Sequence, residues 1–103
     1  MRVGSVPSLE ICSWYSLTCA SLRSTSSAIV RPSRFVGLHF FNPVQLMRLV
    51  EVVRTDDTDD DVFEASKAFG AACGKTPVSC KDTPGFVVNR LLVPYMVQAI
   101  DML

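Results

Sequence analysis

The sequence has no excess of charge and no long apolar run. Ten basic residues balance ten acidic ones, and 19% of the 103 residues are charged. No basic surface is therefore expected that would attract nucleic acid or hold the chain on a membrane. No apolar run reaches the roughly 18–20 residues that a membrane-spanning helix needs. Nucleic acid and membranes are excluded as expected partners.

Glycine and histidine are also scarce. The five glycines stand at positions 4, 37, 70, 74 and 85, and they cannot form the GxGxxG motif that binds a dinucleotide diphosphate. The four cysteines stand at 12, 19, 73 and 80. Because they form no CxxC pair and only one histidine is available, no metal site is expected. We expect free thiols in a reducing compartment.

The N-terminal third has a composition of its own. Residues 1–34 hold nine serines, four arginines and a single acid, Glu10. Such a composition resembles an organelle transit peptide, which is rich in serine and arginine and poor in acids. It is equally typical of a disordered or foreign terminus. We predict that residues 1–33 are a disordered or unrelated leader.

Ordered structure is predicted from residue 34 onward. Residues 34–41 and 48–54 are rich in aromatic and β-branched residues and read as two strands, separated by the Asn42-Pro43 break. The acidic run 55–61 suits a solvated turn or the start of a helix. A helix over 60–73 follows, with an apolar face of Val62, Ala65, Phe69 and Ala72 and with Gly74 as its C-cap.

The last third predicts a change of architecture. Residues 76–81 read as a third strand, 82–85 as a turn, and 86–103 as a long apolar helix bent at Pro94. The fold class is therefore α/β.

A hairpin of the two strands would place the only histidine opposite the only acid of the second strand. If the hairpin is centred near residue 45, Glu51 faces His39, and Leu38 with Val52 and Phe40 with Val50 form an apolar opposite face. Facing side chains have Cβ atoms about 4.5–5.5 Å apart, within reach of a hydrogen bond. The pair could be a dyad, in which the carboxylate fixes the imidazole tautomer and leaves the other nitrogen free as a base. It could equally be a polar pair in a structural hairpin.

Three further polar residues stand out in the ordered part of the sequence, and one of them, Asn89, leaves two alternatives open. Asn89 interrupts the apolar helix and could brace a neighbouring turn or point its amide at a ligand. Lys75 and Lys81 are expected to be ordinary surface charges.

Two segments carry a resemblance to a known family. "RFVGLHFFNPVQLMRLVEVVR" and "GKTPVSCKDTPGFVVNRLLVPYMVQAI" occur in the order and spacing of the short-chain L-3-hydroxyacyl-CoA dehydrogenases. The resemblance runs from about Arg34 to the end of the chain. It implies an α/β fold with the C-terminal part of a Rossmann-type sheet followed by the first helix of an all-α domain. The division it implies is 1–33 leader, 34–83 end of a dinucleotide-binding domain, and 84–103 start of a helical domain. The resemblance implies NAD as cofactor, an acyl-CoA as substrate and oxidation of a 3-hydroxyl to a ketone in fatty-acid β-oxidation.

The resemblance also implies a set of site residues. His39 would be the general base and Glu51 the carboxylate that orients it, as the catalytic pair. Asn89 would help to position the substrate, and Asn42 would lie near the nicotinamide. Ser26, in the segment "STSS", would be the matching active-site serine, although it stands closer to His39 than the family pattern has it.

The chain departs from the family at both ends. The glycine-rich loop of the family is missing. The resemblance implies a family-type homodimer, but the helices that dimerise family members are largely absent. We therefore expect an internal fragment that is inactive by itself. The alternative is a non-catalytic module that associates with full-length dehydrogenase subunits. The resemblance and the N-terminal composition favour the mitochondrial matrix, with the cytoplasm as the alternative compartment.

Overall fold

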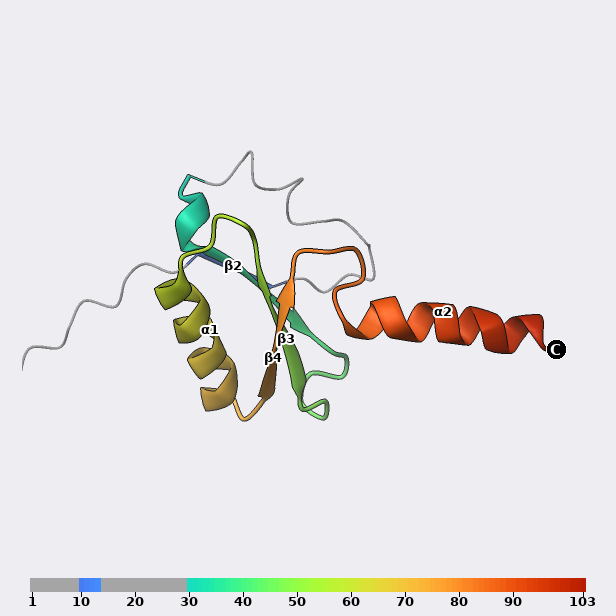
Figure 1. The fold of residues 1–103 in the computed structure, drawn as a ribbon. Coiled ribbons are helices and arrows are strands. Elements are labelled where there is room, and N and C mark those ends of the chain that lie inside the picture. Colours follow the sequence, from blue (N-terminus) through green and yellow to red (C-terminus); the bar gives the residue numbers. More distant parts are fainter. Residues whose placement is uncertain (1–9, 14–29) are drawn as a thin grey trace, which may run out of the picture.

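Four strands form one sheet that carries a helix on one face and continues into a second helix (Figure 1). The computed structural model describes residues 10–13 and 30–103. The strands lie in the order β1 (Glu10–Ser13), β2 (Phe35–Phe40), β3 (Leu49–Arg54) and β4 (Thr76–Lys81). β2 and β3 are antiparallel, whereas the outer pairs β1–β2 and β3–β4 are parallel. The helices are α1 (Asp60–Ala72) and α2 (Val88–Asp101), and a 3-10 turn (Pro32–Arg34) precedes β2.

The predicted α/β class is confirmed, and the element boundaries agree closely. β4 occupies the predicted range, β3 and α1 differ from prediction by one residue at one end, and β2 differs by one residue at each end. Gly74 follows α1 with φ of 72°, the left-handed conformation that glycine adopts at helix C-termini.

β1 corrects the expectation for the N-terminal segment. It lies inside residues 1–33, which we predicted to be a disordered or unrelated leader. Its four residues pair in parallel with β2, from Glu10 opposite Phe35 to Ser13 opposite Leu38. Ladder hydrogen bonds join backbone groups, so a short strand can form without an alternating side-chain pattern. Residues 10–13 and the 3-10 turn are therefore ordered in the structure, whereas an unrelated leader over residues 1–33 stays a prediction.

The first core cluster lies between α1 and the sheet. It contains Val36, Leu38, Val50, Val52, Val62 and Phe63, with Phe40 packed against its edge. The strand residues are the alternating set that the predicted hairpin register placed on one face. Burial of side chains of this size contributes about 1.5–3 kcal/mol each. This cluster therefore holds α1 on the sheet.

The buried face of α1 differs from the predicted one. Val62, Phe63, Ser66 and Gly70 face the sheet. Phe69 is 44% exposed, so the predicted stripe through Ala65, Phe69 and Ala72 is wrong except at Val62. The reason is steric, because a Cβ on Gly70 would lie 3.1 Å from Val50 Cγ1. Small side chains at 66 and 70 let the helix backbone approach the sheet, and Phe69 could not.

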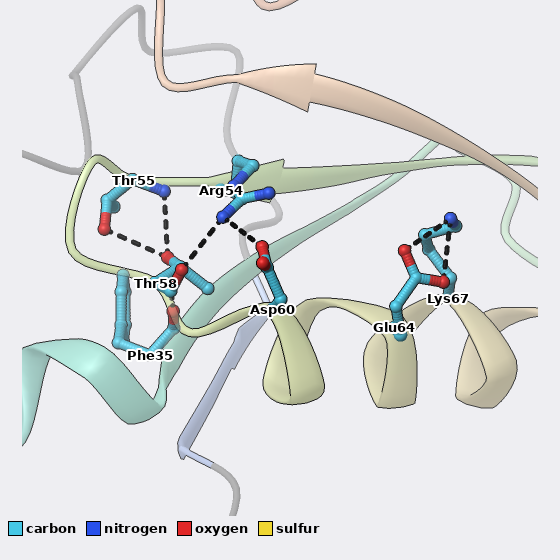
Figure 2. Close-up of polar contacts among 7 residues, drawn as sticks. All are labelled: Phe35, Arg54, Thr55, Thr58, Asp60, Glu64 and Lys67. Carbon is cyan, nitrogen blue, oxygen red and sulfur yellow. Dashed lines mark hydrogen bonds and ion pairs between the residues drawn. The ribbon is translucent and has the colours of Figure 1, made fainter.

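The start of α1 is fixed by a polar network in the acidic turn (Figure 2). Thr58 Oγ1 accepts a hydrogen bond from the Thr55 amide at 2.9 Å and donates one to the Phe35 carbonyl at 2.9 Å. Arg54 Nη2 donates to the Thr58 carbonyl at 3.0 Å and to Asp60 Oδ1 at 2.9 Å. The turn therefore joins β2, β3 and α1.

The other face of the sheet leads to α2. Phe35, Val53 and Cys80 form a second buried cluster, against which Phe86 packs. Gly85 and Phe86 have φ of 77° and 46°, outside the helical region. For this reason α2 begins at Val88, two residues later than predicted. In Figure 1, α2 projects away from the sheet, and none of its residues is buried.

Candidate functional site

The strand register brings His39 and Glu51 together. Residues 39 and 51 are direct partners in the antiparallel β2–β3 ladder, as the predicted pairing had it. His39 Nδ1 lies 2.7 Å from Glu51 Oε2. The Glu51 side chain is fully buried, whereas that of His39 keeps 14% of its surface exposed. The contact is thus a buried carboxylate against an imidazole that is still reachable.

The second oxygen of Glu51 binds backbone amides. Oε1 accepts hydrogen bonds from Val87 N–H at 3.0 Å and from Val88 N–H at 2.9 Å, where α2 begins. Burial by itself raises the pKa of Glu51, but the hydrogen bonds from His39, Val88 and Val87 outweigh it and hold the pKa below its ordinary value of 4.5. Glu51 is therefore a carboxylate at neutral pH.

The ionised Glu51 determines the tautomer of His39. A carboxylate only accepts hydrogen bonds, so Nδ1 must carry the proton and donate it. In the neutral ring the lone pair then resides on Nε2. Within residues 10–13 and 30–103, Nε2 has no hydrogen-bond partner. The site therefore presents an imidazole nitrogen that can accept a proton.

Two aromatic rings hold the imidazole from its sides. The centroid of His39 lies 4.7 Å from that of Phe41 and 5.5 Å from that of Phe86, in tilted arrangements. Neither ring was predicted to belong to the site. Phe41 could have been found, because residues two apart in a strand point to the same face. Phe86 could not, because only the tertiary fold brings it to β2.

Two of the other predicted site residues, Asn42 and Asn89, lie in the described part of the chain. Asn42 stands in the exposed turn after β2, and Asn89 is the second residue of α2 and partly buried. In the described part of the chain, neither amide side chain hydrogen-bonds to His39 or Glu51. Ser26 lies outside the described residues.

Lys75 has a structural contact that was not expected. Its ammonium group donates to the Val44 carbonyl and, at 2.9 Å, to the Met47 carbonyl. The Leu46 and Met47 amides in turn donate to the Pro43 carbonyl. Lys75 therefore fixes the loop that follows His39 and Asn42, and the prediction of an ordinary surface charge is wrong for it.

Two kinds of site are absent from the part of the chain that the structure describes. No group of three or more His, Cys, Asp or Glu side chains there could hold a metal ion. Among the same residues, neither helix has both the length and the apolar character required to span a bilayer.

The sheet, its covering helix and the oriented imidazole define a class of protein. The described residues form a mixed α/β sheet in which a carboxylate-bound imidazole can accept a proton at its second nitrogen. The sequence model of the NAD-binding domain of 3-hydroxyacyl-CoA dehydrogenase matches residues 16–83. The chain belongs to the 3-hydroxyacyl-CoA dehydrogenase family.

Curated relatives agree over most of the chain. The human mitochondrial hydroxyacyl-coenzyme A dehydrogenase is 57% identical over 81 residues, which are 79% of this chain and 26% of that protein. The 3-hydroxybutyryl-CoA dehydrogenase of Bradyrhizobium diazoefficiens is 50% identical over 80 residues, covering 78% of this chain and 27% of the relative. The chain thus spans about a quarter of the length of these relatives.

Solved structures show the same fold. FadB2 of M. tuberculosis superposes with a TM-score of 0.77 at 45% identity, over 82% of this chain and 30% of that one. The (S)-3-hydroxybutyryl-CoA dehydrogenase PaaH1 of Ralstonia eutropha gives a TM-score of 0.80 at 37% identity, over 88% and 31% of the two chains. The sheet and helices described above therefore belong to the Rossmann-type fold of this family.

NAD is the cofactor of the family domain that matches this chain. Within the described residues, His39 offers an imidazole nitrogen that can accept a proton. The glycines at 37, 70, 74 and 85 form no phosphate-binding loop, so the described residues offer no cradle for the diphosphate.

Proposed function

We propose that the chain carries the proton-transfer half of an NAD-dependent oxidation of a 3-hydroxyacyl-CoA to a 3-oxoacyl-CoA. The observation that carries the proposal is the 2.7 Å contact between His39 Nδ1 and the buried carboxylate of Glu51. It lies within a segment that matches the dehydrogenase family. A structural hairpin would not need a fully buried carboxylate aimed at a partly exposed imidazole.

The proposed chemistry assigns one role to each member of the pair. His39 Nε2 accepts the proton of the substrate 3-hydroxyl as the carbinol becomes a ketone. Glu51 keeps the ring in the tautomer that leaves Nε2 unprotonated, and its negative charge stabilises the imidazolium that forms. NAD, when bound, supplies the acceptor for the hydride that leaves the carbinol carbon. The hydroxyl proton and the hydride thus have separate destinations.

Two asparagines complete the proposed site. Asn89 would position the acyl-CoA substrate, because it stands in the first turn of α2, one residue beyond the Val88 amide that binds Glu51. Asn42 would lie near the nicotinamide, in the loop that Lys75 fixes. We also infer a domain boundary near residues 83 and 84, which is supported by the family match ending at residue 83.

The metabolic setting is part of the same proposal. A 3-hydroxyacyl-CoA is an intermediate of fatty-acid β-oxidation, and the human and pig relatives are named mitochondrial. We infer the mitochondrial matrix as the compartment on this similarity.

A chimera tests the proposed function. Residues 30–103 replace the matching segment of the human relative, and NADH formation is followed with a 3-hydroxyacyl-CoA. We expect an active chimera, and a rate about 10²–10⁴-fold lower for His39→Gln, the range that general-base catalysis usually contributes. Glu64→Gln, which alters an exposed carboxylate on α1, is the matched control and should leave the rate unchanged. A folded chimera that turns over equally well with His39→Gln would refute the proposed role.

A second candidate is an interaction module that docks onto full-length dehydrogenase subunits. The observation in its favour is α2, where Leu91, Tyr95 and Ile100 are 70%, 72% and 63% exposed. An apolar surface of this kind favours association. A sizing column with the human relative distinguishes the two candidates, since co-elution supports docking and a clean monomer without affinity argues against it.

A further inference from the structure

In the described part of the chain, the start of α2 is joined to the sheet through Glu51 and through Phe86. α2 buries none of its residues, and Phe86 is the apolar residue ahead of it that packs on the second core cluster. The two hydrogen bonds that join its first turn to the sheet, from Val87 and Val88, both end on Glu51 Oε1. Within the described part of the chain, no side chain caps α2 from its own N-cap position.

The geometry of Glu51 allows one carboxylate to hold two elements. Oε2 is bonded to His39 on β2 and Oε1 to the amides at the start of α2, so the same side chain from β3 contacts both. Free N–H groups at a helix start carry partial positive charge, and a carboxylate satisfies them well. The tight turn before α2 directs these amides at Glu51. In that turn Gly85 has φ of 77°, and an added Cβ would lie 3.0 Å from the Arg90 nitrogen.

We propose that Glu51 is a positioning residue for α2 as well as for His39, so that one carboxylate sets where Asn89 stands relative to the base. Its meaning for catalysis rests on the proposed function, in which His39 is the base and Asn89 a substrate contact. The hydrogen bonds from Val87 and Val88 to Glu51, here called the tether, are a property of the folded chain and can be measured without turnover.

Four variants of the full chain separate the hydrogen bonds of the two Glu51 oxygens. His39→Gln removes the partner of Oε2 and leaves the hydrogen bonds of Oε1 intact. Glu51→Gln keeps an oxygen for the two amides but offers an N–H₂ group to His39, which must then present Nδ1 as the acceptor. Glu51→Ala removes the hydrogen bonds of both oxygens. Gly85→Ala leaves Glu51 unchanged but displaces the turn, and it decides the matter if Glu51→Ala does not fold.

Amide hydrogen exchange and ¹⁵N NMR give the readouts. We expect the Val87 and Val88 amides to be protected in the unaltered chain, in His39→Gln and in Glu51→Gln. In Glu51→Ala and Gly85→Ala they should exchange about tenfold faster or more, as for the loss of hydrogen bonds to a charged group, while the β3 amides stay protected. The His39 proton should reside on Nδ1 in the unaltered chain and on Nε2 in Glu51→Gln.

The outcomes distinguish this inference from the proposed function. Unchanged Val87 and Val88 protection in folded Glu51→Ala, or in Gly85→Ala if the former does not fold, overturns the tether. An unchanged His39 tautomer in Glu51→Gln overturns the claim that Glu51 orients His39. If both readouts behave as expected and the chimera has no activity, the tether stands and the proposed function fails.

Discussion

At the scale of single residues, buried polar groups shape this site more than exposed ones. Glu51 is fully buried but has a hydrogen-bond partner for each oxygen, so its charge is compensated. Cys80, on the same face of the sheet, is buried without a charged partner and donates weakly to the Val52 carbonyl at 3.6 Å. One group is therefore held ionised and the other neutral.

The Glu51 carboxylate should make stability depend on acid. Because its pKa is lowered in the folded chain, it stabilises fully above its unfolded value of about 4.5. This contribution is lost as the pH falls through the folded pKa. Glu51→Gln should therefore be less stable at neutral pH, and the difference should shrink below pH of about 4.5. Urea unfolding at several pH values measures it, with Glu64→Gln as control. A difference that does not change with pH would contradict the prediction.

The Cys80 thiol should resist alkylation. Burial, together with the negative charges of Glu51 and Asp82, raises the pKa of Cys80 to about 12. At pH 8 such a thiol is ionised in roughly one molecule in 10,000, and the thiolate is the reactive form. We expect iodoacetamide to label the exposed Cys73 in the folded chain and to label Cys80 only after denaturation. Peptide mass spectrometry distinguishes the two, and rapid native labelling of Cys80 would show that it is accessible.

At the scale of elements, helix–sheet distance decides which face of α1 is buried. Ser66 and Gly70 lie against the sheet, although the larger apolar Phe69 stands next to Gly70 in the sequence. Two cations also lie over the ring of Phe63, with Arg54 Cζ 4.9 Å and Lys67 Nζ 5.6 Å from its centroid. The helix is therefore placed by close approach along one side and by a covered aromatic ring near its start.

Enlarging Gly70 should separate α1 from the sheet. The Cβ position already lies 3.1 Å from Val50 Cγ1 and 3.6 Å from Pro77 Cβ. Gly70→Leu should lower the free energy of unfolding by about 1–3 kcal/mol, as overpacking usually does. Ala71→Leu, on the exposed side of the same helix turn, is the matched control and should have little effect. Chemical denaturation compares the two, and equal stabilities would mean that the approach is not tight.

At the scale of the whole molecule, the chain joins a packed sheet to an uncovered helix. Both core clusters belong to the sheet side, and α2 adds no buried residue to them. The dyad lies where the two parts meet.

The 103-residue chain should have no measurable turnover by itself. A general base contributes about 10²–10⁴-fold, whereas holding the reactants together contributes about 7–11 kcal/mol. The second contribution needs a diphosphate site, and the five glycines of the chain form no GxGxxG loop. NADH formation by the purified chain with a 3-hydroxyacyl-CoA is the measurement. Turnover that disappears in His39→Gln would contradict the expected inactivity.

The sequence by itself determined strands β2, β3 and β4, the extent of α1 and the pairing of His39 with Glu51. These depend on local preference and on the two-residue period of a hairpin, and both can be read along the chain. The tertiary structure alone decided β1, the buried face of α1, the Phe86 contact and the binding of Glu51 to α2. Each of these depends on backbone groups or on distances between segments far apart in sequence. Such distances are set by packing, which the order of the residues does not state directly.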